Sequence, residues 1–150
     1  MCSNFVTFQG NETKLKMIEN LFDKMIARQN LDGKGQLPGG INGSVFLFDI
    51  YKNDASSFSF ETKWCPPVFE LVEIADLFDL DFEVSYEEMG CLVYGKSFYE
   101  EGRLFEMCLD DEDFELCENP EDDVFIFEGN RYECQNDILE ILLSRKLSYY

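Results

Sequence analysis

A thiol at the predicted start of a helix is the strongest candidate for a reactive group in this sequence. The 150 residues contain no histidine, which excludes Ser-His-Asp and Cys-His catalysis, HExxH sites and every other histidine-containing zinc site. Cys65 precedes Pro66 and Pro67, and a thiol at a helix N-terminus can have a lowered pKa and act as a nucleophile or redox centre. Glu61 and Glu70 lie close in sequence and disfavour the thiolate. We therefore expect Cys65 to be unreactive and the chain not to be an enzyme.

Trp64, Tyr86 and Glu88 outline a candidate pocket. Trp64 ends one predicted strand and Glu88 ends another, so the three side chains would lie close together if these strands were neighbours. Such a pocket would make the chain a small ligand-binding module or an enzyme, which is the alternative function. Large aromatic side chains more often pack in a core. The favoured prediction is therefore that Trp64 packs beneath the turn formed by residues 65–67.

Acidic residues dominate the second half of the chain. There are 31 Asp and Glu residues against 12 Lys and Arg residues, which gives a formal charge of -19. Residues 1–60 hold six acids and six bases, so all the excess negative charge lies beyond them. A field of this sign repels phosphate backbones and anionic membrane surfaces. We expect neither direct nucleic-acid binding nor membrane binding.

Two groups of carboxylates are candidate partner-binding residues. One lies on the exposed side of a predicted strand in which polar and apolar residues alternate, and the other lies in the acidic stretch 110–123. A calcium loop is not expected, because Val84 stands where an EF-hand requires glycine and a strand points its carboxylates outward in a row. The sequence therefore predicts no metal and no cofactor. The candidates are Asp79, Asp81, Glu83 and Glu87 in the first group, and Asp110, Asp111, Glu112 and Asp113 in the second.

A row of carboxylates along a strand presents a line of negative charge. Residues two apart on a strand are separated by roughly 6.6 Å, whereas duplex DNA carries one charge per about 1.7 Å of helix axis. Such a line can occupy a groove that binds phosphates. We therefore predict a nonenzymatic interaction protein that covers the basic groove of a nucleic-acid-binding partner by nucleic-acid mimicry. The alternative is that the acids keep a Phe-rich protein soluble and that function resides in the Trp64 pocket.

The elements that position these residues follow a β-α-β-β-α-β order and then continue. This order matches an α+β, ferredoxin-like antiparallel sheet with helices on one face, extended by additional C-terminal strands and a terminal helix. We expect one domain over residues 1–150, with an acidic extension from about 103–150. Asn136 is expected to cap the last helix, and residues 110–123 are expected to form an exposed loop or edge. The predicted strands are 3–9, 45–51, 58–62, 79–88, 91–99, 103–109 and 124–127, the helices are 12–29, 67–78 and 136–147, and 30–44 is irregular.

The cysteines and the N-terminal residues predict a cytoplasmic protein. Residues 1–8 lack the basic and apolar regions of a signal peptide, and no apolar run approaches the roughly 20 residues of a membrane span. The six cysteines show no C-x-x-C spacing, so we expect free thiols, most of them buried as small apolar residues. Three disulfides in a secreted protein are the alternative.

Three motifs resemble the YubB-type ferredoxin-like family encoded on plasmids and phages. They are Cys2-Ser3-Asn4 at the first strand, Phe60-x-Thr62-x-Trp64-Cys65-Pro66-Pro67 before the second helix, and Glu88-x-Gly90 followed by Gly95. The resemblance covers mainly residues 58–102 and implies a ferredoxin-like fold and a mobile-element origin, with no established reaction. Together with the charge pattern, that origin suggests a basic host protein as partner. The chain would inhibit a host nucleic-acid-binding or defence protein in the host cytoplasm.

Overall fold

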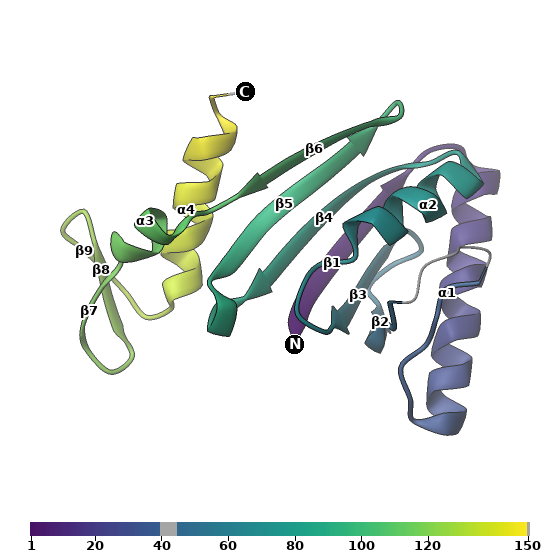
Figure 1. Ribbon diagram of the computed structural model, residues 1–150, viewed down its shortest axis with the longest axis horizontal. Coiled ribbons are helices and arrows are strands. Elements are labelled where there is room, and N and C mark those ends of the chain that lie inside the picture. Colours follow the sequence, from purple (N-terminus) through teal and green to yellow (C-terminus); the bar gives the residue numbers. More distant parts are fainter. Residues whose placement is uncertain (40–44, 150) are drawn as a thin grey trace.

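The computed structural model describes residues 1–39 and 45–149 and contains a sheet of six strands (Figure 1). The strands are β1 (Cys2–Gln9), β2 (Phe48–Lys52), β3 (Ser57–Thr62), β4 (Asp81–Glu88), β5 (Val93–Glu100) and β6 (Arg103–Cys108), and the covering helices are α1 (Glu12–Asp32) and α2 (Val68–Phe78). All neighbouring strands are antiparallel, in the order β2-β3-β1-β4-β5-β6. The expected α+β, ferredoxin-like fold is confirmed, and β5 and β6 extend its sheet beyond β4.

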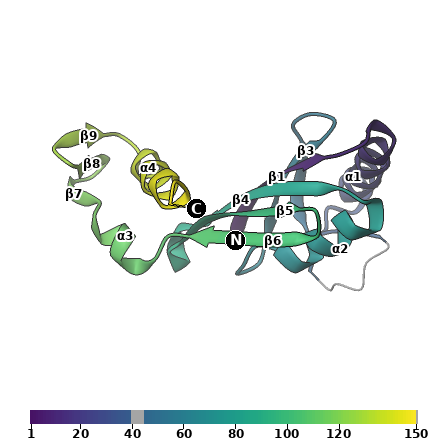
Figure 2. The ribbon, with the colours of Figure 1, turned by 90° about the horizontal axis from the view of Figure 1, so that it is seen from above.

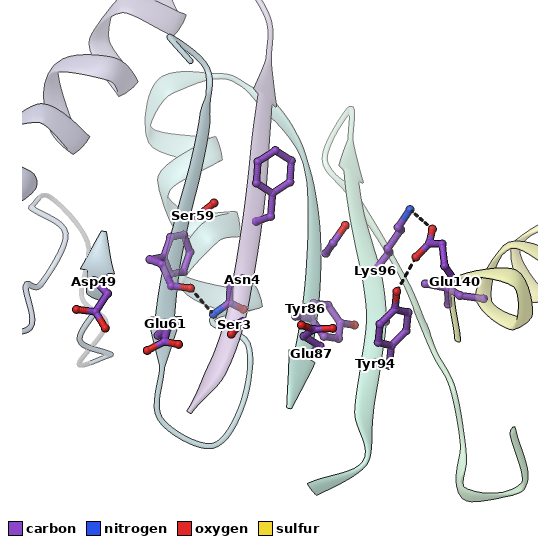
Figure 3. Close-up of a pocket in the computed structure, with 15 residues that line it drawn as sticks. Ser3, Asn4, Asp49, Ser59, Glu61, Tyr86, Glu87, Tyr94, Lys96 and Glu140 are labelled. Atoms are coloured by element: carbon purple, nitrogen blue, oxygen red, sulfur yellow. Dashed lines mark hydrogen bonds and ion pairs between the residues drawn. The ribbon is translucent and has the colours of Figure 1, made fainter. Parts of the chain in front are cut away.

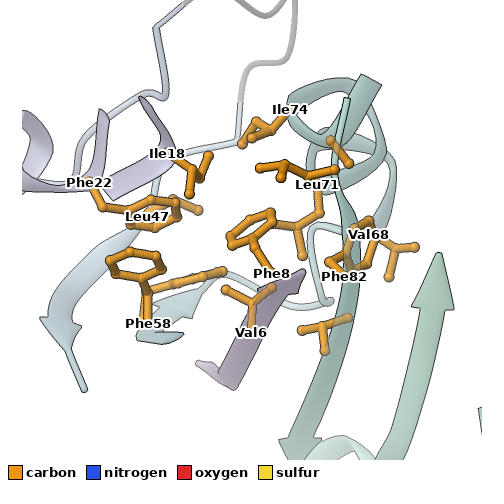
Figure 4. Packing of buried hydrophobic residues seen from close by; sticks show 14 of the residues in the cluster. Val6, Phe8, Ile18, Phe22, Leu47, Phe58, Val68, Leu71, Ile74 and Phe82 are labelled. Atoms are coloured by element: carbon orange, nitrogen blue, oxygen red, sulfur yellow. The ribbon is translucent and has the colours of Figure 1, made fainter. Parts of the chain in front are cut away.

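The two helices cover one face of the sheet and bury a core rich in phenylalanine (Figure 4). The Phe22 ring of α1 stacks on the Phe58 ring of β3, with 4.0 Å between the ring centroids. Asn11 caps α1 by accepting a hydrogen bond from the backbone N–H of Thr13. The helix continues past its predicted end at residue 29 and stops where Gly33 adopts a left-handed conformation.

A second apolar cluster forms beyond β6. It includes α3 (Asp111–Glu115), a three-stranded sheet of β7 (Glu118–Glu121), β8 (Val124–Phe127) and β9 (Asn130–Tyr132), and α4 (Gln135–Leu147). Leu139 and Leu143 of α4 are fully buried in this cluster, and Tyr94 and Met107 of the large sheet pack against it. Figures 1 and 2 show α4 at the β5–β6 side of the large sheet, far from α1. The C-terminal helix therefore forms a wall at one side of the sheet.

The face of the sheet opposite α1 and α2 is called the open face. Alternation along each strand sends Val6 and Phe8 to the helices and their neighbours Phe5 and Thr7 to the open face. Antiparallel pairing then assigns the matching residues of the other strands to the same face. The open-face residues of the four central strands are Ser3, Phe5, Thr7 and Gln9; Ser57, Ser59 and Glu61; Asp81, Glu83, Ser85 and Glu87; and Tyr94, Lys96, Phe98 and Glu100.

The acidic stretch 110–123 differs from the expected loop. Asp111–Glu115 forms the short helix α3, because Asp110 and Asp113 make a reciprocal capping box at its start. Glu118–Glu121 forms β7 at the edge of the small sheet, so this part of the stretch agrees with the expected exposed edge. The high density of acidic residues favours a loop prediction, and the capping box that stabilises α3 is therefore not predicted.

Several predicted boundaries are wrong for local reasons. The strand predicted at 79–88 begins at Asp81, because Asp79 ends α2 in a left-handed conformation with φ of 54°. Asn136 is not the cap of α4: Cys134 occupies that position and Asn136 lies in the first turn. In the strand predicted at 45–51, Leu47 makes only an isolated bridge with Gln36 before β2 begins. Residues 40–44 of the predicted irregular segment lie outside the described residues.

All six cysteines are free thiols, but the expectation that most are buried is wrong. Cys2 is buried, and burial raises the pKa of its thiol to about 11. Cys117 is half-buried and the other four are exposed. In the part of the chain that the structure describes, no helix has the length and apolarity needed to cross a membrane.

Candidate functional site

Carboxylates flank a small residue on the open face. Ser3 of β1 is paired with Glu61 of β3 on one side and with Glu87 of β4 on the other. Directly opposite residues have Cβ atoms about 4.5–5.5 Å apart, so the Cβ atoms of Glu61 and Glu87 lie roughly 10 Å from each other across Ser3. Asp81 and Glu83 continue the acidic side of β4 on the same face.

A cavity of about 430 Å³ opens on this face between α4 and β2 (Figure 3). Its floor consists of Phe5 and three serines from adjacent strands, Ser3, Ser59 and Ser85. Ser59 and Ser85 are paired with Phe5 on its two sides, and Phe5 is 43% exposed. Because its cross-strand neighbours are small, the Phe5 ring is accessible from the cavity. The other open-face and wall side chains are Asp49, Glu61, Glu87, Tyr94, Lys96, Glu140 and Leu143.

Glu140 of α4 binds both β5 side chains that border the cavity. The Tyr94 hydroxyl donates to Glu140 Oε2 at 2.7 Å, and Lys96 Nζ donates to Oε1 at 3.2 Å. The Tyr94 hydrogen bond, followed by the Lys96 contact, lowers the pKa of Glu140 despite partial burial. Burial and the bond to Glu140 raise the pKa of Tyr94. Near neutral pH, Glu140 is therefore ionised and compensates the charge of Lys96.

The remaining charges of the cavity are negative. Within residues 1–39 and 45–149, the Glu61 side chain makes no hydrogen bond or ion pair. Glu87 Oε2 accepts a hydrogen bond from Asn136 Nδ2 of α4 at 2.8 Å, which positions the carboxylate without neutralising it. The charged groups that line the cavity are Asp49, Glu61, Glu87, Glu140 and Lys96. With four carboxylates against one ammonium, the cavity has a negative potential that favours cationic ligands.

Trp64, Tyr86 and Glu88 are not brought together. β1 lies between β3 and β4, so the two strands are not neighbours. Trp64 is 78% exposed, and the expectation that it packs beneath the turn is wrong. Tyr86 points to the helix-covered side, where its hydroxyl lies 3.1 Å from Ser97 Oγ, and it borders the cavity only through its place on β4. Glu88 lies 2.7 Å from the amino group of Met1.

The second predicted acidic group serves the cap of α3. Asp110 accepts from the backbone N–H of Asp113 at 3.0 Å, and Asp113 accepts from that of Asp110 at 2.9 Å. Lys146 Nζ of α4 lies 3.3 Å from Asp110 and 2.5 Å from Asp113. Asp111 and Glu112 are exposed. Two of the four carboxylates are therefore already used within the chain.

Hydrogen bonds on the helix-covered side join residues of two sequence motifs. Asn4 Nδ2 donates to Thr62 Oγ1 at 3.0 Å and to the carbonyl oxygen of Cys2 at 3.0 Å. Thr62 Oγ1 donates to the carbonyl oxygen of Cys65 at 2.7 Å. These bonds tie β1, β3 and the approach to α2 together. They give Asn4 and Thr62 a structural role. Ser3, which lies between Cys2 and Asn4 in sequence, faces the cavity.

The sequence prediction missed most of the cavity. Ser3 and Phe5 fall in a correctly predicted strand, but they become site residues only through their pairing with β3 and β4. Lys96 and Glu140 are 44 residues apart in sequence and meet only because α4 packs beside β5. Alternation in β1 is the one sequence signal that places Phe5 opposite the core. Over the described residues, no group of three His, Cys, Asp or Glu side chains is arranged to hold a metal ion.

Comparison with known proteins identifies the family. No curated protein and no solved structure matches the chain. A family model described as "Ferredoxin-like domain in Api92-like protein" matches residues 46–128, which is more than half of the chain. The match begins just before β2 and ends just after β8, so it includes β3, β4 and β5 of the cavity but neither β1 nor α4. The chain belongs to the family of ferredoxin-like domains in Api92-like proteins.

Proposed function

We propose that the chain is a nonenzymatic binding protein that docks its open face onto a basic surface of a partner protein. The observation that carries this proposal is the cavity on that face, where four carboxylates stand against one lysine that is already paired. Complementary potentials steer association and suppress wrong partners. The half-buried carboxylates Asp81 and Glu83 extend the negative surface beyond the cavity.

Single-stranded nucleic acid fits this face less well than a basic protein. Aromatic residues on an open sheet, such as Phe5, Tyr94 and Phe98, are typical of surfaces on which bases stack. Such surfaces also need cations for the phosphates. On the open face Tyr94 is paired with Glu87 and Phe98 with Glu83, and these carboxylates repel phosphates.

The identity of the partner is proposed from the resemblance in sequence. The YubB-type motifs support a mobile-element origin, in a plasmid or a phage. On that basis the partner is a basic host protein, either a nucleic-acid-binding protein or a component of host defence, and the chain inhibits it in the host cytoplasm by mimicking nucleic acid. The absence of histidine supports a nonenzymatic role.

A small-ligand-binding module is the second candidate function. The cavity volume of about 430 Å³ favours it, because small-molecule sites commonly enclose about 300–1,000 Å³. The ligand would enter beside Phe5 and not at Trp64, which lies outside the cavity.

Affinity capture with matched variants tests the docking proposal. The open-face variant carries Glu61→Gln, Glu83→Gln and Glu87→Gln, and the control carries Glu115→Gln, Glu118→Gln and Glu121→Gln in the C-terminal part. Both variants lose the same charge. We expect the wild type and the control to retain a basic protein that salt releases, and the open-face variant to lose it. Equal retention by both variants would show that the open face is not the docking surface.

A further inference from the structure

The cavity combines three features that a general acidic surface lacks. It has an accessible aromatic ring at its centre, hydroxyl groups on the floor, and carboxylates at opposite sides. Phe5 supplies the ring, Ser3 and Ser85 are among the floor hydroxyls, and Glu61 and Glu87 are the carboxylates. Together they describe a site for a cation that is planar and carries several hydrogen-bond donors.

The strand register brings the two carboxylates toward one position. Glu61 and Glu87 flank Ser3, whose short side chain leaves space above the strand. A Glu side chain is long enough to lean over a small neighbour, so both carboxylates can reach a single cation placed above Ser3. Asn136 holds Glu87 from α4 at 2.8 Å. One side of the site is therefore already ordered before any ligand arrives.

Phe5 provides the surface against which such a cation can stack. It lies one position further along the face than Ser3 and is 43% exposed, between Ser59 and Ser85. An arginine guanidinium stacks on aromatic rings and offers five donors in a rigid plane, whereas a lysine ammonium is a strongly hydrated point charge. The Phe5 ring can stack on the guanidinium plane, and the surrounding carboxylates and hydroxyls can accept hydrogen bonds from its N–H groups.

The cavity favours an organic cation over a metal ion. The carboxylates do not converge as a group of three ligands anywhere in the described residues. Lys96 lines the cavity, and its pairing with Glu140 at 3.2 Å keeps it against α4. Among residues 1–39 and 45–149 Glu61 makes no ion pair, and the Met1 amino group, which interacts with it electrostatically, is paired with Glu88 at 2.7 Å.

We propose that this cavity holds one arginine side chain of the basic partner, with its guanidinium against Phe5 and between Glu61 and Glu87. The proposal rests on the proposed docking of the open face and names the group that anchors it. Arginine is favoured over lysine because the site supplies both a ring to stack on and acceptors on two sides.

Titration with short peptides tests the proposal directly. The probes are acetyl-Gly-Arg-Gly-amide and acetyl-Gly-Lys-Gly-amide. Calorimetry measures the affinity of each peptide, and the backbone amide NMR signals of Ser3, Phe5 and Ser85 report where it binds. We expect the arginine peptide to shift these signals and to bind several-fold more tightly than the lysine peptide. Glu61→Gln with Glu87→Gln should weaken it about tenfold or more, because charge-assisted hydrogen bonds are lost. Phe5→Leu should weaken it about two- to fivefold, which is the range of an exposed cation–π contact.

Three results would overturn the arginine assignment. They are equal binding of the two peptides, equal loss in the Glu115→Gln with Glu118→Gln control, and tighter binding of free methylguanidinium, which carries the same single charge, than of the arginine peptide. The last result would make the cavity a site for free guanidinium compounds. Failure of the docking proposal has a different signature: the arginine peptide would bind in the cavity while the affinity capture shows no basic protein that depends on the open face.

Discussion

At the scale of single residues, exposure decides what a large side chain contributes to stability. Trp64 is 78% exposed, so Trp64→Ala should change the free energy of unfolding by less than about 0.5 kcal/mol. Phe22 is fully buried and stacked on Phe58, and Phe22→Ala should cost about 3–5 kcal/mol. Urea unfolding of both variants measures the difference. A loss with Trp64→Ala as large as that with Phe22→Ala would contradict the exposed position.

Residue type alone predicted burial poorly at the chemically conspicuous positions. Aromatic area favours a buried Trp64, yet the residue stands in a turn with φ of 72°, outside both apolar clusters. Tyr86, a candidate pocket residue, lies on the helix-covered face of β4, where its hydroxyl contacts Ser97 Oγ of β5 at 3.1 Å. Such outcomes depend on which strands are neighbours, which no single residue encodes.

At the scale of elements, the cap of α3 explains why an acidic stretch is ordered. Asp110→Ala removes the side-chain acceptor and should lower the free energy of unfolding by about 1 kcal/mol. Asp110→Asn keeps an N-cap acceptor, so it should cost clearly less, although it also loses the exposed contact with Lys146. Thermal or urea unfolding distinguishes the two. Equal effects of the Ala and Asn variants would show that charge, and not capping, is what Asp110 supplies.

The contact of α4 with β5 should depend on pH through Glu140. The pKa of this carboxyl lies below its ordinary value of 4.5, chiefly because Tyr94 donates a hydrogen bond to it. A lowered pKa in the folded state means that the ionised form stabilises the fold above pH 4.5, and that this contribution is lost as the pH falls through the lower folded value. Glu140→Gln should therefore lower the melting temperature near neutral pH.

The same comparison at acid pH completes the test. Well below pH 4.5 the wild type also loses the ionised carboxylate, so its melting temperature should approach that of Glu140→Gln. Glu115→Gln, at an exposed position, should follow the wild type throughout. A difference between the wild type and Glu140→Gln that stays constant with pH would exclude a role for the charge.

Elements were more predictable than the contacts between them. The β-rich composition of β1, the alternation in β4 and the helical spacing in α1 predicted those elements closely, and their order predicted the ferredoxin-like sheet. Periodicity does not encode strand order, and because β1 separates β3 from β4 the arrangement that a Trp64 pocket requires does not form. The position of α4 likewise depends on apolar contacts between segments distant in sequence. The cavity cannot be predicted without both the strand order and the position of α4, because its residues come from several strands and from that helix.

At the scale of the whole molecule, the charge of -19 opposes the compact state through self-repulsion. Within the described residues, the side chains of Glu61 and Glu83 make no hydrogen bond or ion pair. In a Glu87→Gln variant the amide oxygen can still accept the bond from Asn136. Neutralising all three carboxylates removes repulsion without breaking an ion pair. The open-face variant should therefore melt at the same temperature as the wild type, or slightly above it.

Salt separates this electrostatic effect from a change in packing. The Debye length falls from about 30 Å at 0.01 M salt to about 10 Å at 0.1 M, so any gain in melting temperature should shrink as salt is added. The control with Glu115→Gln, Glu118→Gln and Glu121→Gln should behave in the same way, because it carries the same net charge. A melting temperature below that of the wild type at every salt concentration would contradict this prediction. If the open-face variant stays folded and alone loses the basic partner, the loss of binding follows from the position of its carboxylates on the sheet.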